Sequence, residues 1–290
     1  MFSQLLINSL IAGAIYTLVA VGFTIIYRTV KFFHFAHGMV YTCGAYFGYT
    51  FAVQLGFHPV LSFLIAPVLV GLIGVAIDKL VYSPLRKHKS HNLVFLIASF
   101  GVFIFLQNLI QLLYGAQMLT LRTGPVKEGH LFIGGVITDT QIAILCVSLL
   151  LFIALSLFIN KSKLGKAMRA VADDRVAASV VGINPERIIL IAFFVGSILA
   201  GAAGILISFE TNIEPTMGMN AILKGMTASI IGGVGSIPGA ALGGFFLGLA
   251  ENFGIWKISS AWKDCIAFAI LIIFLLVKPS GILGRKTEKE

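Results

Sequence analysis

The chain of 290 residues is 58% hydrophobic and only 11% charged, and its mean hydropathy is +0.98. This composition excludes an ordinary soluble globular protein and indicates repeated apolar spans. The formal net charge of +9 does not require nucleic acid as a partner, because membrane proteins concentrate Lys and Arg in their cytoplasmic loops. We therefore predict an all-α fold, a polytopic transmembrane helical bundle that forms a single domain over residues 1–290.

Eight segments have roughly the length that an apolar helix needs to cross about 30 Å of hydrocarbon. They are residues 5–27, 38–55, 60–82, 92–114, 141–160, 188–209, 227–255 and 262–278. The first lacks the positive region of a secretory signal, so we interpret it as a transmembrane helix and not as a cleaved peptide. The seventh contains the Gly- and Pro-rich run IGGVGSIPGAALGG (231–244), which predicts a broken or re-entrant segment.

The distribution of charge predicts the orientation of the bundle. The loop 83–91, the stretch 161–187 and the tail from Lys278 are rich in Lys and Arg, and we expect them in the cytoplasm. We expect residues 115–140, where Arg122 and Lys127 are balanced by acids, and the acidic segment 210–220 on the outside. A single simple crossing at 227–255 would then leave the tail outside. Either that segment is broken, therefore, or a shorter one is re-entrant.

The stretch Lys161–Arg187 is too polar to lie in hydrocarbon, yet it has the pattern of a helix. Its apolar residues form one stripe at helical spacing, namely Met168, Val171, Ala172, Val176 and Val180. Gly182, followed by Asn184 and Pro185, is a stop signal. The stretch therefore predicts one short amphipathic helix between two membrane spans, a cytoplasmic loop of the domain.

No pattern in the chain indicates catalysis or nucleotide binding. The sequence holds no GxxxxGK[ST] phosphate loop, no HExxH and no GxSxG, so we predict a subunit that is not an enzyme and carries no cofactor of its own. Cys43, Cys146 and Cys265 each lie in apolar surroundings and are interpreted as small hydrophobic residues, not metal ligands.

Several polar or Gly-rich places are candidates for a transport pathway. The elements 34–48 and 225–244 are both rich in glycine and occupy corresponding positions in the two halves, as interrupted helices of transporters do. The candidate lining residues are His37, Gly38, Gln107, Asn108, Gln111, Gly232, Gly233 and Gly235. For some of these residues a purely structural role is an open alternative to a role in the pathway. The pair His34 and His37 could bind a metal, carry protons or only pack, and the three amides of 92–114 could hydrogen-bond a neighbouring helix.

Glu251 and Asn252 lie near the end of an apolar segment. A charge there can reach the membrane surface at little cost, so we interpret Glu251 as an interfacial residue.

Four strings resemble the permease subunits of bacterial ABC importers for branched-chain amino acids, the Liv-type systems, and of related urea and amide importers. They are NSLIAGAIYTLVAVGFTIIY (8–27), FAHGMVYTCGAY (35–46), LGKAMRAVADDRVAASVVGIN (164–184) and KGMTASIIGGVGSIPGAALGGFFLGLAE (224–251). The FAHG string and the short length resemble the smaller of the two permease types. Two positions depart from the family's pattern, His34 where an Asn is common and Met39 where an acid is common.

The resemblance implies that the loop 161–187 is the coupling helix that docks on an ATPase subunit. The residues that match the family's loop are Gly165, Arg169, Ala170, Asp173, Asp174, Ala177, Ala178, Gly182 and Ile183. It also implies a second permease subunit, two ABC ATPase subunits that bind ATP and magnesium, and an external substrate-binding protein. The expected location is the bacterial cytoplasmic (inner) membrane, with lipid around several spans.

The expected function is therefore import of branched-chain or other neutral amino acids through this subunit. A permease for urea or short amides is one alternative. A self-sufficient secondary transporter is another; it would need a charged site inside the membrane, and Glu210, Glu214 and Glu251 are all expected at span ends.

Overall fold

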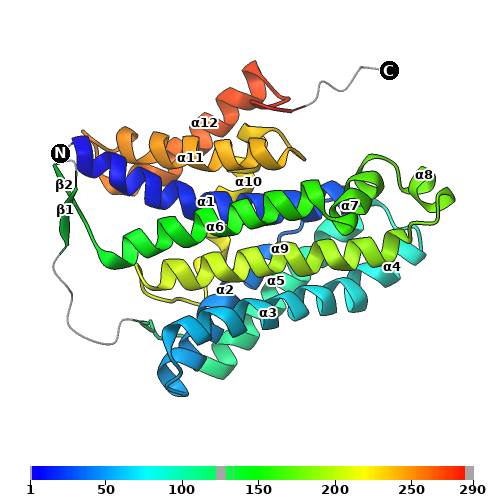
Figure 1. The fold of residues 1–290 in the computed structure, drawn as a ribbon, viewed down its shortest axis with the longest axis horizontal. Helices are drawn as coiled ribbons and strands as arrows, with labels where there is room; N and C mark the ends of the chain where they lie inside the picture. The colour runs from blue at the N-terminus through cyan, green and yellow to red at the C-terminus, as the bar shows by residue number, and fades with distance from the viewer. Residues whose placement is uncertain (1, 122–128, 133, 285–290) are drawn as a thin grey trace.

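The computed structural model describes residues 2–121, 129–132 and 134–284, which form the helical bundle of Figure 1. Its α-helices are α1 (Phe2–Val30), α2 (His37–Tyr49), α3 (Pro59–Ile77), α4 (Ser83–Lys87), α5 (Asn92–Tyr114), α6 (Asp139–Lys161), α7 (Lys163–Asp173), α8 (Arg175–Val180), α9 (Pro185–Ser208), α10 (Met217–Gly232), α11 (Ile237–Gly254) and α12 (Lys263–Val277). Three short turns complete the helical part, η1 (Thr50–Gln54) and η2 (Asp78–Tyr82), which are π-helical, and η3 (Ser260–Trp262), which is 3-10.

The prediction of a transmembrane helical bundle is confirmed, with one small addition. Strands β1 (His130–Phe132) and β2 (Gly135–Ile137) pair antiparallel, with His130 opposite Ile137. The balancing residues Arg122 and Lys127, and the tail residues after 284, lie outside the described residues.

Six helical stretches of the described chain are long and apolar enough to cross a membrane: Phe2–Val30, Pro59–Lys87, Asn92–Tyr114, Asp139–Lys161, Pro185–Ser208 and Ser260–Val277. The predicted span 38–55 is helical too, with α2 continuing into η1 as far as Gln54, but it is not one of these six stretches. The predicted segment 227–255 is broken, as its Gly- and Pro-rich run indicated. The chain there forms two helices, α10 and α11, bent by 117° at their junction.

The break between α10 and α11 was predicted, and its cause lies in two glycines. Gly233 and Gly235 have φ angles of +109° and +88°, a backbone region that side chains disfavour. Ser236 then caps α11 by accepting a hydrogen bond from the Gly239 N–H, and Pro238 lies in the first turn of that helix. We call residues 233–236 the hairpin turn.

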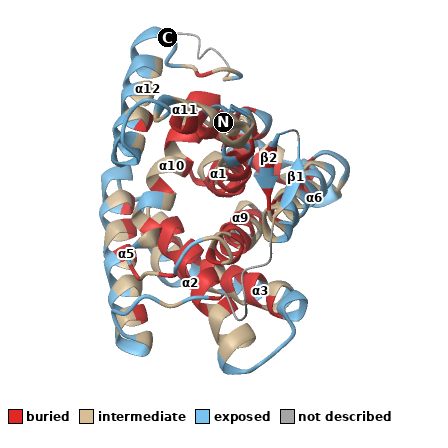
Figure 2. Cartoon of the chain, turned by 90° about the vertical axis from the view of Figure 1, so that its left-hand side faces the viewer, coloured by how far each residue is buried: buried red, intermediate tan, exposed pale blue. Residues whose placement is uncertain are grey.

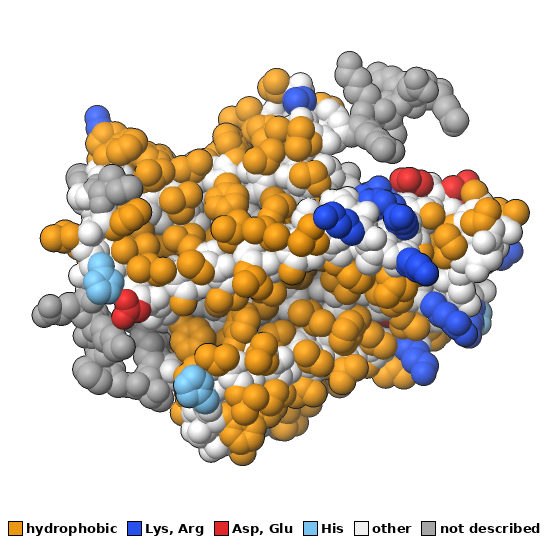
Figure 3. All heavy atoms as spheres, viewed as in Figure 1, with side chains coloured by type: hydrophobic (Ala, Val, Ile, Leu, Met, Phe, Trp, Pro, Cys, Tyr) orange, Lys and Arg blue, Asp and Glu red, His pale blue; other side chains and the backbone are white. Residues whose placement is uncertain are grey.

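The hairpin also bears on which end of the bundle carries the C-terminal tail, a question that the sequence left open. The N–H groups of Ile282 and Leu283 donate to the carbonyls of Ile231 and Gly232, at 2.8 and 2.9 Å, so the tail lies beside the hairpin turn. The same end of the bundle carries α4, α7 and α8, and Figure 3 shows most of the Lys and Arg side chains on that view gathered there. We call it the basic end, and its excess of Lys and Arg predicts that it faces the cytoplasm.

Burial divides the spans into a centre and a periphery. In the apolar windows of α1 and α9, 83% and 72% of the residues are buried, against 22% in α5 and α6 and 6% in the stretch that ends with α12. Figure 2 shows the buried residues concentrated on the central helices. Small residues let the central backbones approach closely. A Cβ added to Gly44 of α2, for example, would lie 2.3 Å from the carbonyl oxygen of Gly201 in α9.

This close approach makes a prediction about stability. Gly44→Val should lower the free energy of unfolding by about 3 kcal/mol and the Tm by roughly 5–10 °C, because the obstructing atom belongs to a backbone that cannot move aside. Thermal unfolding of the purified protein in detergent measures the change. Gly101→Val in α5 is the matched control, because a Cβ there meets nothing within 4 Å. Equal losses in the two variants would contradict this account of the helix contact.

The orientation makes a second prediction. In a background with Cys43, Cys146 and Cys265 replaced by Ser, a cysteine at Leu131 (85% exposed) should react with a membrane-impermeant thiol reagent in intact cells. A cysteine at Val180 (81% exposed) should react only after permeabilisation, because it lies at the basic end. The reverse pattern of labelling would invert the assigned orientation.

Candidate functional site

The loop 161–187 folds as two helices, so the predicted single amphipathic helix is wrong. Asp174 adopts an extended conformation (φ −149°, ψ 117°), and its carboxylate accepts hydrogen bonds from the N–H groups of Val176 (2.7 Å) and Ala177 (3.0 Å). An aspartate that caps a new helix in this way ends the preceding one. The predicted stripe is therefore divided. Met168, Val171 and Ala172 are buried under α7, whereas Val176 and Val180 are exposed.

The first half of the loop is held firmly against the bundle. Gly165 permits the sharp turn from α6 into α7, since a Cβ there would lie 2.4 Å from the carbonyl oxygens of Phe158 and Ile159. Arg169 donates to Asn160 Oδ1 at 3.0 Å. Ala170 is half-buried within α7.

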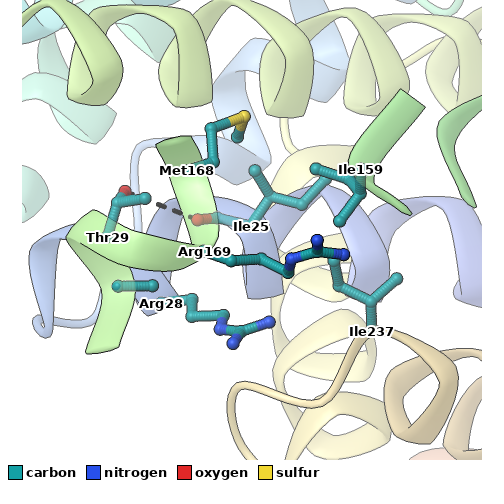
Figure 4. A pocket seen from close by; sticks show the side chains of 8 residues that line it. Ile25, Arg28, Thr29, Ile159, Met168, Arg169 and Ile237 are labelled. Atoms are coloured by element: carbon teal, nitrogen blue, oxygen red, sulfur yellow. Dashed lines mark hydrogen bonds between the residues drawn. The ribbon is translucent and has the colours of Figure 1, made fainter. Parts of the chain in front are cut away.

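Two contacts join the loop to the end of α1. Asp173 forms an ion pair with Arg28 at 3.4 Å, and Arg175 donates to the carbonyl oxygen of Thr29. Figure 4 shows the adjoining contact, where Arg28 and Arg169 extend in the same direction toward Ile237. A displacement of the loop would therefore act directly on α1.

A third link joins the loop's far end to α3 and α4. Arg86 binds Asp78 through two hydrogen bonds, at 2.6 and 2.9 Å, and also binds Glu186 at 2.9 Å. Asp78 is fully buried, so this bidentate pair supplies the partner that a buried charge requires. Asp78 was not among the predicted site residues, although an acid in an apolar span is itself a signal.

The second half of the loop presents an apolar surface away from the bundle. The side chains of Val176, Val180 and Val181 are 72%, 81% and 74% exposed, and we call these three residues the valine patch. Ala177 is exposed beside it, Ala178 is buried beneath it, and Ile183 is half-buried. Gly182 has a φ of +84°, which ends the helix and turns the chain toward α9.

A cavity of about 630 Å³ opens at the basic end between α1, α6, α7 and the hairpin turn. Arg28, Lys31 and Arg169 line it, against one acid, Asp173. Burial first, and then the charge of Arg28, lower the pKa of the Lys31 ammonium. Gly235 is the one predicted pathway residue in the lining of this cavity.

None of the other predicted pathway residues lines this cavity. His37 is fully buried beside Gly22, and Gly38 faces the backbone of Gly218 in α10. Asn108 bonds its own helix through the Ile104 carbonyl at 2.8 Å, while Gln107 and Gln111 are half-buried on α5. Gly232 contacts the backbone of Gly239, and Gly233 contacts that of Gly284. Their role in a pathway remains a prediction.

The histidine pair is built into the core. His34 Nδ1 lies 2.9 Å from the hydroxyl of Tyr82, and both histidines are fully buried. No group of three His, Cys, Asp or Glu side chains gathers around a potential metal position anywhere in the described part of the chain.

A charged cluster lies inside the bundle where none was expected. Lys224 of α10 contacts Glu251 of α11 at 3.2 Å, Tyr16 of α1 at 3.1 Å and Asp264 of α12 at 3.2 Å. The Tyr16 hydroxyl also donates to Glu251 at 2.8 Å. Glu251 is fully buried, so its interpretation as an interfacial residue is wrong. Lys224, a lone cation between apolar residues, was the overlooked signal, because such a charge needs a partner in a membrane.

A second cavity, of about 460 Å³, adjoins this cluster and opens toward the end opposite the basic one. We call it the outer groove. Tyr16 and Lys224 line its inner part, and residues of the segment 211–217 line its mouth. Glu214 is among these and is half-buried, and its carboxylate has no hydrogen bond or ion pair to any residue that the structure describes.

The charged cluster makes a prediction about stability. Lys224→Met should destabilise the protein by about 3–5 kcal/mol, because it leaves Glu251 as a buried charge without a cation. The double variant Lys224→Met, Glu251→Gln should recover most of that loss. Thermal unfolding in detergent measures both, with the exposed Lys257→Met as the control. A double variant no more stable than Lys224→Met would show that the pair is not coupled.

Comparison with known proteins agrees with this architecture. Residues 5–275 match the family model described as branched-chain amino acid transport system, permease component. The chain is 38% identical to the high-affinity branched-chain amino acid transport system permease protein BraD of Pseudomonas aeruginosa and 37% identical to LivH of Escherichia coli K12. Each alignment covers 98% of this chain and 96% of the relative.

More distant proteins share the fold. The probable branched-chain amino acid transport permease protein LivH of Methanocaldococcus jannaschii is 30% identical over 99% of this chain and 94% of its own. A solved chain of PsaBC from Streptococcus pneumoniae, in complex with Fab, superposes with a TM-score of 0.55 at 12% identity, over 94% of this chain and 91% of that one. From its sequence and its helical architecture, the chain belongs to the family of permease components of branched-chain amino acid transport systems.

Proposed function

We propose that this protein is the membrane-spanning permease subunit of an ATP-driven importer for branched-chain amino acids. The observation that carries the proposal is the near full-length match to permease proteins named for that transport. The multi-span bundle supports a role in forming the passage. The sequence lacks a phosphate-binding loop, so ATP and magnesium would bind to separate ATPase subunits.

The valine patch is the proposed docking surface for the ATPase. Three exposed valines beside the small Ala177 form an apolar surface that another protein can approach closely, and Asp173 and Asp174 add charge beside it. The ion pairs of Asp173 and Glu186 and the bonds of Arg175 would carry a movement of the patch to α1 and α4. Because α1 packs against α9, α10 and α11, such a movement reaches the centre of the bundle.

The remaining partners follow from the same proposal. A second permease subunit would complete the passage, and an external binding protein would deliver the substrate at the end opposite the basic one. With the basic end in the cytoplasm, the subunit would reside in the inner membrane of a bacterium. The exposed apolar faces of α5, α6 and α12 would contact lipid or the second subunit.

The charged cluster bears on the rival proposal of a self-sufficient secondary transporter. Such a transporter needs a charged site within the membrane, and Lys224 with Glu251 is a charged pair buried within the protein. Proteoliposome uptake separates the two proposals. An ATP-driven importer should move leucine only with its ATPase subunits and ATP, whereas uptake by this chain alone under a proton or sodium gradient would favour the rival.

The docking surface makes a prediction for mutants. Val176→Asp with Val180→Asp should abolish ATPase association and uptake, because two carboxylates would enter an apolar contact. Both side chains are exposed, so the free energy of unfolding should change by no more than about 0.5 kcal/mol each. Co-purification of the ATPase and uptake of labelled leucine measure the loss. Val136→Asp, exposed at the other end of the bundle, is the matched control. Normal co-purification with the double variant would exclude this docking surface.

A further inference from the structure

The outer groove has two walls of opposite character. On one side α1 contributes Ala12, Ile15, Tyr16 and Val19, which are spaced i, i+3, i+4 and i+7 and therefore share one face of the helix. On the other side α10 and its cap contribute Thr216, Asn220 and Lys224, spaced by one helical turn each. A mainly apolar face thus opposes a ladder of polar side chains across a cavity of about 460 Å³, a volume in the usual range of ligand pockets, about 300–1,000 Å³.

The mouth of the groove carries a carboxylate with no internal partner. Glu214 is half-buried, which costs its carboxylate solvation, and no hydrogen bond or ion pair of that carboxylate within the described chain compensates the cost. It lies next to donors of hydrogen bonds. Asn212, Thr216 and Asn220 line the same groove, and the N-terminus of α10 behind them has no side-chain cap. One acid therefore faces a set of N–H and O–H donors.

The inner end of the groove is closed by the charged cluster. The three protons of the Lys224 ammonium correspond to its three contacts, with Tyr16, Glu251 and Asp264. Lys224 is therefore fully engaged, and the attraction for a ligand must come from Glu214 and the neutral donors. Such a lining favours a ligand that carries a cation and an anion close together, with no net charge, and an apolar remainder.

From these features we infer that the outer groove binds the substrate as an α-amino acid zwitterion with an aliphatic side chain, an inference that rests on the proposed function. The α-ammonium pairs with Glu214. The carboxylate accepts hydrogen bonds from Asn220 and Thr216, at the positive end of the α10 dipole. The aliphatic side chain lies against Ile15, Val19 and Met217. Urea, which has no charge and no aliphatic part, would leave Glu214 unpaired.

Two variants test this site in the assembled importer, with its ATPase and binding protein. Glu214→Gln removes the charge that holds the ammonium, and Ala12→Phe fills the groove from the apolar wall. Each should lower leucine uptake per ATP hydrolysed on the order of tenfold or more, as expected for the loss of a charged hydrogen bond or of binding space. Asp139→Asn, at the same end, and Ala143→Phe, exposed on α6, are the matched controls and should transport normally.

Equilibrium binding gives a second readout on the purified full-length chain. Radiolabelled leucine should bind the wild type and be displaced poorly by 4-methylpentanoate, which lacks the ammonium. In Glu214→Gln that preference should be lost. The Tm of this variant should stay at the wild-type value, since Glu214 has no ion pair within the described chain to lose.

The outcomes separate the two levels of the proposal. If the wild-type importer moves no leucine with ATP, the proposed function itself fails. If the wild type moves leucine, and Glu214→Gln and Ala12→Phe do so equally well with the same ligand preference, the function stands and the assignment of the groove is overturned.

Discussion

The rest of the bundle depends on the close contact of helix backbones at pairs of glycines. A Cβ on Gly22 of α1 would lie 2.7 Å from the carbonyl oxygen of Gly196 in α9, and the reverse distance is the same. Gly38 and Gly218 join α2 to α10 in the same reciprocal way. In a membrane the solvent is as apolar as the side chains, so helices associate through contact area and not through exclusion of water. Paired glycines maximise that contact, and they determine which helices are central.

The same constraint explains the location of charge. Close backbones leave little room for water, so a charge between them needs a protein partner. Asp78 has Arg86, and Glu251 has Lys224 and Tyr16. Through the contacts Arg86–Glu186 and Tyr16–Glu251, each group also joins helices that are distant in the sequence. Each therefore fixes how one part of the bundle is placed against another, at opposite ends of the molecule.

The composition of the chain and the spacing of its apolar residues were sufficient to predict the bundle, the position of most spans and the basic end. The reason is that the length and hydropathy of a segment determine whether it can lie in lipid. The break between α10 and α11 was also predictable, since Gly233 and Gly235 are unusual within a span. The exact course of the chain was not predictable. In the sequence Asp174 is one more polar residue of a helical pattern, and only the structure shows that its carboxylate caps α8. Glu251 lies near a segment's end in sequence, yet it is fully buried and contacts Tyr16 of α1 and Lys224 of α10. For the loop 161–187 and the lining residues, function remains a prediction that packing alone does not test.

The hydrogen bonds of the tail have a consequence for how the protein is made. The carbonyls of Ile231 and Gly232 lie at the end of a helix, where carbonyl groups have no N–H donors within the helix. They obtain donors from Ile282 and Leu283, about fifty residues later in the chain. During synthesis the hairpin therefore enters the membrane with two open carbonyls at its tip. Its two carbonyls gain their donors only after α12 and residues 282 and 283 have been made. The order of translation thus leaves the end of α10 incomplete until the chain beyond α12 is present.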